Sequence, residues 1–126
     1  MQRQLYQVMA SKLAALRNCE KDGIADWQAK HEAALDELAA ELPSGSGWDN
    51  GTKLDLARST PERLVFFGAY HHMDDGGGYD GWTEHTITVT PSLAFGIRVA
   101  VGGRNRNDIK DYLAELFQCA LTAIVE

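Results

Sequence analysis

Apolar residues recur at steps of three and four through the first forty residues, which is the spacing of one face of an α-helix. The pattern predicts a first helix over 2–19 and a second over 24–42, together a helical hairpin over 1–42. Gly23 lies between them and readily takes the left-handed conformation that ends helices. The recurring residues of the first helix are Leu5, Val8, Met9, Leu13 and Leu16, and those of the second are Ile24, Trp27, His31, Ala34, Leu35, Leu38 and Leu42.

After residue 52 the period of the pattern falls to two, which is typical of a β-strand with one buried face. Leu54 and Leu56 alternate with polar residues, and a run rich in β-branched and aromatic residues follows at 63–67. These two strands are predicted to join at 59–61. Two further strands are indicated by His85, Ile87 and Val89, and by Phe95, Ile97, Val99 and Val101. Pro91 lacks the N–H that a sheet ladder needs, so it is predicted to mark the turn between them.

A last helix is predicted to begin at Asn107 or Asp108, with Asn107 as its N-cap. Its apolar face comprises Ile109, Tyr112, Leu113, Leu116, Phe117, Ala120, Leu121 and Ile124. The order of two helices, four strands and one helix predicts an α+β fold. Because the strands are joined by short links, a four-stranded antiparallel meander over 52–103 is expected, with the helices on one face and the C-terminal helix over 107–126.

The composition supports one globular domain over 1–126, because 44% of the residues are hydrophobic and 24% are charged. The formal net charge of −6 argues against binding of duplex nucleic acid. No apolar stretch is long enough for a signal peptide or a membrane span, so a cytoplasmic location is expected. Cys19 and Cys119 lack the spacing of a zinc site and are expected to be buried free thiols.

The first candidate site is the glycine- and arginine-rich segment between the last strand and the last helix. Gly103 allows backbone to approach a ligand, and a helix N-terminus presents free N–H groups to an anion. Arg104 and Arg106 flank Asn105, and their planar guanidinium groups suit phosphate oxygens. The segment predicts a phosphate site, with a polar turn carrying two solvated arginines as the alternative.

The second candidate site is the segment 70–82, predicted to be a hairpin loop. His71 and His72 suggest a metal site, but neighbours on a strand point to opposite faces, so metal binding is disfavoured. Tyr79 and Trp82 are predicted to stack on a base or sugar ring, with His72 or Asp80 forming a hydrogen bond to it. An ordinary surface hairpin anchored by Trp82 is the alternative.

The third candidate is the segment 42–52, which is rich in turn-forming residues and hydroxyl groups. Trp48 is unusual in a flexible linker, so the segment is expected to be an ordered connection. Ser44 or Ser46 with His71 and Asp80 would provide the groups of a hydrolase, but no GxSxG elbow is present. Catalysis is therefore the less favoured class, and no cofactor is expected.

Several stretches of the last two thirds of the chain resemble a family of short bacteriophage proteins. They are LPSGSG at 42–47, YDGWTEHT at 79–86, VTPSL at 89–93 and NDIKDYL at 107–113. The order of elements is also similar to that of the phage anti-Thoeris proteins, oligomeric sponges that sequester cyclic ADP-ribose signals and, in some members, cyclic oligonucleotides. This resemblance implies that Arg104 and Arg106 grip the ligand, with the ring supplied by Phe66, Tyr79 or Trp82. The acidic pair Asp74 and Asp75 departs from such a site.

The resemblance implies a protein of the infected bacterial cytoplasm that sequesters a small phosphate-bearing nucleotide without cleaving it. A protein-binding inhibitor of a host factor is the alternative, and a small hydrolase is a further one. A homo-oligomer, at least a dimer, is expected from the residues themselves. The sheet can cover only part of the apolar stripes of the first two helices, which include Trp27, Leu35 and Leu38.

Overall fold

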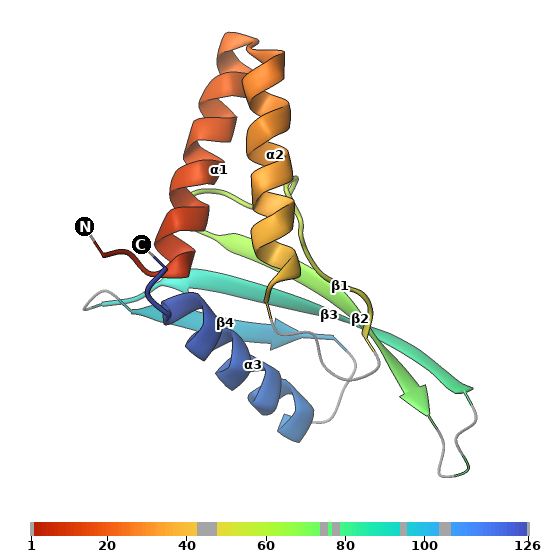
Figure 1. Cartoon of the computed structure of the whole chain (residues 1–126). Helices are drawn as coiled ribbons and strands as arrows, with labels where there is room; N and C mark the ends of the chain where they lie inside the picture. The colour runs from red at the N-terminus through yellow and green to blue at the C-terminus, as the bar shows by residue number, and fades with distance from the viewer. Residues whose placement is uncertain are drawn as a thin grey trace.

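The predicted α+β class and order of elements are confirmed (Figure 1). The computed structural model describes residues 2–42, 48–73, 76, 79–93, 96–103 and 107–125; within 48–51, 69–73, 79–84 and 107–109 it describes the backbone only. The elements in the described residues are α1 (Leu5–Asp22), α2 (Ala25–Ala40), β1 (Trp48–Leu54), β2 (Leu64–Met73), β3 (Tyr79–Pro91), β4 (Ile97–Gly102) and α3 (Asn107–Thr122).

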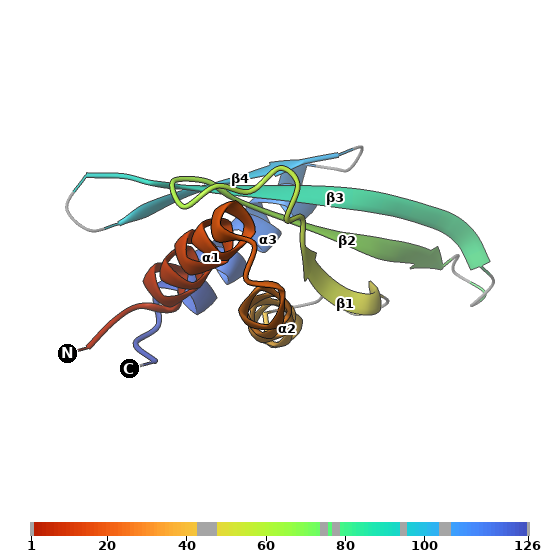
Figure 2. The same cartoon turned by 90° about the horizontal axis from the view of Figure 1, so that it is seen from above.

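The four strands form one antiparallel sheet in the order β1-β2-β3-β4. This is the predicted meander, and β3 ends at Pro91 as expected. Figure 2 shows α1, α2 and α3 together on one side of the sheet. The opposite side carries no helix among the described residues, so one face of the sheet is closed by helices and the other is open.

One hydrophobic core draws on all seven elements. His85, Ile87 and Val89 share the helix-covered face of β3 and are fully or almost fully buried, which confirms the alternation predicted for this strand. On β2, the fully buried Phe66 ring packs against Phe117 of α3, with ring centroids 6.0 Å apart. Burial of these large apolar groups is the main contribution that holds helices and sheet together.

Two predictions for the first helix are confirmed, its buried face and the glycine that ends it. All five predicted apolar residues of α1 are buried, and Gly23 caps the helix in the left-handed conformation, with φ at 72°. The helix begins three residues later than predicted, because the backbone before Leu5 pairs with the C-terminal segment instead. The amide of Val125 donates to the carbonyl of Arg3 at 3.0 Å, and Gln4 forms a β-bridge with Ile124.

The apolar faces of the other two helices are narrower than predicted. On α3, Leu113, Phe117 and Leu121 are buried, but Tyr112 is exposed, and Ile124 lies beyond the helix end with about half its surface exposed. The helix α3 begins at Asn107, one of the two predicted starts, so the N-cap predicted at Asn107 was placed one residue too late in the chain. The outer end of α2 is exposed as well.

The strands extend further than their local pattern indicated. Residues 70–73 and 79–82, predicted to be loop, belong to β2 and β3, where Tyr70 pairs with Thr83 and His71 with Trp82. Residues 48–52, predicted to be a connection, belong to β1. Leu56, predicted to be strand, lies in the turn that follows β1. Cross-strand hydrogen bonding therefore outweighs the weak strand preference of these polar and glycine-containing segments.

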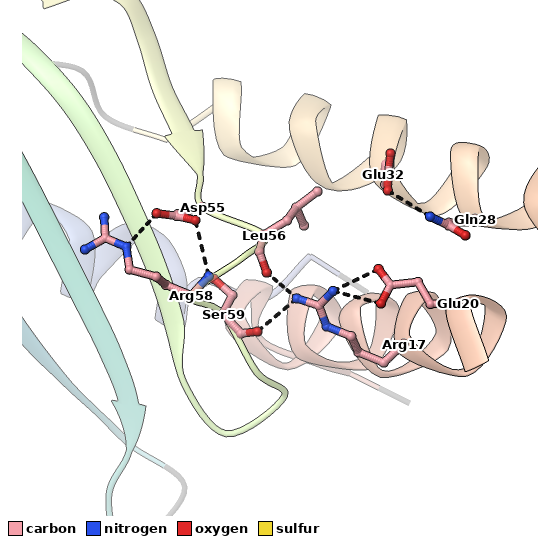
Figure 3. A network of polar contacts seen from close by, with 8 residues as sticks. All are labelled: Arg17, Glu20, Gln28, Glu32, Asp55, Leu56, Arg58 and Ser59. Carbon is pink, nitrogen blue, oxygen red and sulfur yellow. Dashed lines mark hydrogen bonds and ion pairs between the residues drawn. The ribbon is translucent and has the colours of Figure 1, made fainter.

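The turn between β1 and β2 is held by hydrogen bonds at both ends. The Asp55 amide donates to the Val65 carbonyl at 2.8 Å, and the Val65 amide donates to Ser59 Oγ at 2.9 Å. Figure 3 shows Arg17 of α1 reaching this turn, where its guanidinium donates to the carbonyls of Leu56 and Ser59. The same guanidinium donates to Glu20 at 2.8 Å, so Arg17 joins α1 to the β1–β2 turn.

A pH dependence is expected for the pair Asp55 and Arg58 within this turn. The hydrogen bond from the Arg58 side chain holds the pKa of Asp55 below its ordinary value, against a smaller opposing effect of burial. A lowered pKa in the folded state adds stability above the unfolded pKa of about 3.9, and this stability is lost as the pH falls further. Asp55→Asn should therefore lower the free energy of unfolding at pH 7 by less than about 1 kcal/mol, because the pair is partly exposed.

Urea unfolding of wild type and Asp55→Asn at pH 7 and at pH 3 measures this effect. The difference between the two proteins should shrink at the lower pH, where the carboxyl group begins to be protonated in both states. An equal difference at both values would show that the Asp55 charge contributes nothing to the turn.

Candidate functional site

The predicted phosphate segment is described only at its two ends. Gly103 has φ at 118°, a backbone conformation that residues other than glycine rarely adopt. The helix α3 begins four residues later, at Asn107. The chain therefore leaves β4 through a glycine-dependent bend before it enters the helix. Arg104, Asn105 and Arg106 lie outside the described residues, so their proposed contacts with phosphate stay a prediction.

The predicted aromatic site lies on a projecting part of the sheet. The backbones of His72, Tyr79, Asp80 and Trp82 belong to the hairpin of β2 and β3, which extends beyond the end of β4 (Figure 1). β4 ends where Gly102 pairs with Thr86. At about 3.4 Å per residue, Trp82 is about 14 Å and Tyr79 about 24 Å further along β3.

Two candidate sites that were combined by sequence reasoning are thus separated along one strand. A small ligand bound at Gly103 is closer to Trp82 than to Tyr79 or Asp80 of the same chain, because these two residues lie further along β3 from its pairing with β4. Ser44 and Ser46 of the catalytic alternative lie outside the described residues, as do Asp74, Asp75 and Phe95.

Phe66 occupies a different position from that of a ligand-binding ring. It is completely buried between the sheet and α3, where it contacts Phe117. The neighbouring Phe67 points to the open face of the sheet and keeps 36% of its surface exposed. Because successive residues of a strand face opposite sides, the aromatic ring available on this part of β2 is that of Phe67.

Phe67 lies in a row of residues that crosses the entire sheet, which we term the open row. Lys53 of β1 pairs with Phe67, Phe67 pairs with Thr86 of β3, and Thr86 pairs with Gly102 of β4. Neighbouring strands are about 4.8 Å apart, so the row is about 14 Å long and Phe67 is about 10 Å from Gly102. Lys53 and Gly102 are exposed, and Thr86 is half-buried. The open row thus leads from a lysine, past a phenyl ring and a hydroxyl group, to the Gly103 bend.

The open face continues beyond this row with further hydroxyl groups and a second cation. Thr88 pairs with the exposed Ala100, and Thr90 pairs with the exposed Arg98. Lys53 and Arg98 therefore place positive charge on a face of a protein whose formal net charge is −6. An aromatic ring can stack on a base, and cations and hydroxyl groups can bind phosphate and sugar oxygens.

Sequence reasoning missed Phe67 because the run from Leu64 to Phe67 is apolar at every position. Such a run does not reveal which alternate residues face the core. The threonines at 86, 88 and 90 were the available signal, since their strand must present them away from the buried His85, Ile87 and Val89. The partner of Thr86 on β2 is Phe67, but that register is known only from the structure.

A second concave region lies between α2 and β1 on the helix-covered side of the sheet. It is an open hollow of about 280 Å³ lined by Asp36, Ala40, Thr52 and Lys53. Lys53 also belongs to the open row, at the edge of the sheet. Asp36 is exposed and places a carboxylate beside this hollow. Phosphate groups are disfavoured next to a carboxylate, so the open row fits an anionic ligand better than the hollow does.

In the described part of the chain, no cluster of three or more His, Cys, Asp or Glu side chains is arranged to hold a metal ion. None of the described helices is long and apolar enough to cross a membrane. Both cysteines are free, but the prediction that they are buried is wrong, because Cys119 is exposed and Cys19 is half-buried. Their positions lie toward the flanks of α3 and α1 and not at the centres of the buried faces.

The fold therefore defines an α+β protein with an open sheet face that combines a ring, hydroxyl groups and cations. Comparison of the chain with models of known protein families, with curated proteins and with solved structures gave no match. The resemblance to phage proteins stays a prediction.

Proposed function

We propose that this protein binds a small phosphate-bearing nucleotide on the open face of its sheet and sequesters it without cleaving it. The observation that carries the proposal is the exposed ring of Phe67 in the open row, between Lys53 and the bend at Gly103. The proposed ligand class is a cyclic nucleotide immune signal, either a cyclic ADP-ribose isomer or a cyclic oligonucleotide. The proposed setting is phage-type defence inhibition in the cytoplasm of an infected bacterium.

The chemistry of the open face supports this ligand class. Stacking of a base on an aromatic ring contributes about 1–3 kcal/mol and requires an exposed ring face. Lys53 and Arg98 supply charge for phosphate oxygens, and Arg104 and Arg106 are proposed to add to it beyond Gly103. The threonine hydroxyl groups of β3 can both donate and accept hydrogen bonds. A ring, hydroxyl groups and cations hold a nucleotide, whereas cleavage would need an acid, a base or a nucleophile in addition.

The proposal also includes the association of copies into a homo-oligomer. The exposed fractions of Ile24, at 45%, and Trp27, at 55%, support it, because large apolar side chains are costly to leave in water. Ligand binding within one copy and association between copies are separate parts of the proposal, and each has its own test.

Calorimetric titration with cyclic ADP-ribose isomers and with cyclic di- and trinucleotides tests the ligand. Wild type should bind at least one of them, and Phe67→Ala should weaken that binding by roughly tenfold or more through loss of stacking. Arg104→Ala and Arg106→Ala should each weaken it to a similar extent through loss of charged hydrogen bonds. Tyr112→Ala is the control, because it removes an exposed aromatic ring from α3, away from the open row, and should leave affinity unchanged.

Heat denaturation of the complex separates sequestration from catalysis. The ligand should be recovered intact from the denatured protein, whereas an enzyme would return a product. Binding of none of these ligands, or equal affinity in wild type and Phe67→Ala, would refute the assignment of the open row. A host protein that copurified with the chain would then favour the alternative of a protein-binding inhibitor.

A further inference from the structure

The helix α2 leaves most of its surface uncovered. Of its sixteen residues only Leu35 and Ala39 are buried, whereas α1 buries five. Figure 1 shows α1 and α2 rising together from the sheet, so α1 is the one described element beside the outer end of α2. At that end Trp27 is 55% exposed. A helix with so little buried surface is poorly stabilised by its own chain and has a face free for a partner.

One uncovered face of α2 has the spacing of a helix-packing seam. Trp27, Lys30, Ala34, Glu37 and Glu41 follow one another at steps of three and four, so they form one stripe, which we term the α2 seam. All are exposed except Ala34, which is half-buried. The small side chain at its centre permits the close approach of another helix, at the interaxial distance of about 8–10 Å found in packed pairs.

The outer end of the seam is held in one arrangement. The Lys30 ammonium group lies 4.7 Å from the centroid of the Trp27 ring, a cation–π contact, and the His31 ring centroid is 6.1 Å from that of Trp27. Lys30 is therefore positioned beside an exposed ring with its ammonium group accessible to a carboxylate. The inner end of the seam carries Glu37 and Glu41, with the half-buried Leu38 beside them.

The charges along the seam have opposite signs at its two ends. Lys30 is the positive group of the outer half, and Glu37 and Glu41 are the negative groups of the inner half. A second α2 running antiparallel across Ala34 therefore brings the Lys30 of each copy close to the Glu37 of the other. At this crossing Trp27 is level with Glu41 of the second copy, and Lys30 is within one residue of the level of Glu37. A parallel pairing would instead place Lys30 against Lys30.

We propose that the α2 seam is the contact between two copies of this chain, paired antiparallel about a twofold axis at Ala34. Charge complementarity selects a second copy as the occupant, because the seam is complementary to itself only in this orientation. Each Lys30 then faces the Glu37 of the other copy, and each Trp27 covers the inner end of the opposite seam. The inference rests on the self-association included in the proposed function and is independent of the ligand.

Charge reversal tests this contact, with the association constant measured by sedimentation equilibrium at low salt. Lys30→Glu alone and Glu37→Lys alone should each weaken the dimer by about tenfold, because the reversed pair occurs twice in it. The double variant should regain wild-type association. An equimolar mixture of the two single variants should associate better than either alone, since each reversed charge then meets its opposite. Asp36→Lys is the matched control, because it reverses a charge on the flank of α2 that borders the hollow beside β1, away from the seam, and should leave the dimer intact.

Glu and Lys have similar helix propensities, so circular dichroism should show the same helix content in all these variants. A monomeric wild type at tens of micromolar would overturn the proposal. Single variants that dimerise as well as wild type would overturn it too, as would a mixture that fails to recover association. Calorimetry on Lys30→Glu keeps the two proposals apart, because ligand affinity should be unchanged when the dimer is lost, whereas loss of the ligand site leaves the dimer intact.

Discussion

Phe66→Ala should lower the free energy of unfolding by about 3–5 kcal/mol, the cost of removing a fully buried phenyl ring and leaving a cavity. The ring has no exposed surface and contacts Phe117, so neither side can close the space without moving α3 or the sheet. Phe67→Ala, one residue away, should cost about 1 kcal/mol or less, because its ring lies on the open face. Urea unfolding of both variants at pH 7, followed by circular dichroism, measures the difference.

The two variants separate the role of Phe66 in stability from the proposed role of Phe67 in ligand binding. Phe67→Ala should reduce ligand affinity and nearly preserve stability, whereas Phe66→Ala should reduce stability severely. Equal destabilisation by the two substitutions would mean that Phe67 is also a core residue. Its ring would then not be available to a ligand in the open row. Phe66→Leu is a milder control, since it keeps part of the buried apolar volume and should unfold between wild type and Phe66→Ala.

Arg17→Met should lower the free energy of unfolding by about 2–3 kcal/mol, the second largest effect expected. Its guanidinium donates to the carbonyls of Leu56 and Ser59, and a partly buried carbonyl that loses a charged donor costs about 1–3 kcal/mol. Methionine keeps the length of the apolar part of the side chain, so the decrease in the free energy of unfolding measures the lost hydrogen bonds and not lost packing. The ion pair with Glu20 adds little, because it is about one third exposed.

Arg63→Met is the matched control for Arg17→Met. The Arg63 guanidinium donates one exposed hydrogen bond, to the carbonyl of Arg58 at 3.0 Å, and should contribute less than about 1 kcal/mol. Hydrogen exchange should locate the damage in Arg17→Met, with faster exchange at the amides of Asp55 and Ser59 in the β1–β2 turn. If the two arginine variants unfold at the same urea concentration, Arg17 does not hold this turn.

Patterns between near neighbours were sufficient for α1 and for the order of the elements. The residues of α1 that recur at three and four steps are all buried, and Gly23 ends the helix in the left-handed conformation. The alternation of β3 also predicted its buried face, because threonines separate its apolar residues. In each case the information lies within a few residues of the chain, where backbone preferences and side-chain spacing act directly.

The residues of the candidate site could be identified only from the tertiary structure. Sequence reasoning chose Phe66 as a ring for the ligand, but pairing with Ile87 and contact with Phe117 turn Phe66 inward and Phe67 outward. The apolar run around them carries no alternation that would decide between the two. Gly103 has a positive φ, which glycine adopts without strain, and its role at a ligand site stays a prediction.

The same periodicity predicted both α1 and α2, yet α1 buries five residues and α2 only two. The stripe of α2 extends past the edge of the sheet, and none of the described residues covers Ile24 and Trp27 fully. Likewise, the segments 70–73 and 79–82 become strands only because they pair with each other. Local sequence thus determined which segments form helices and which faces are apolar, whereas burial, register and strand length depended on contacts between segments far apart in the chain, which only the assembled fold provides.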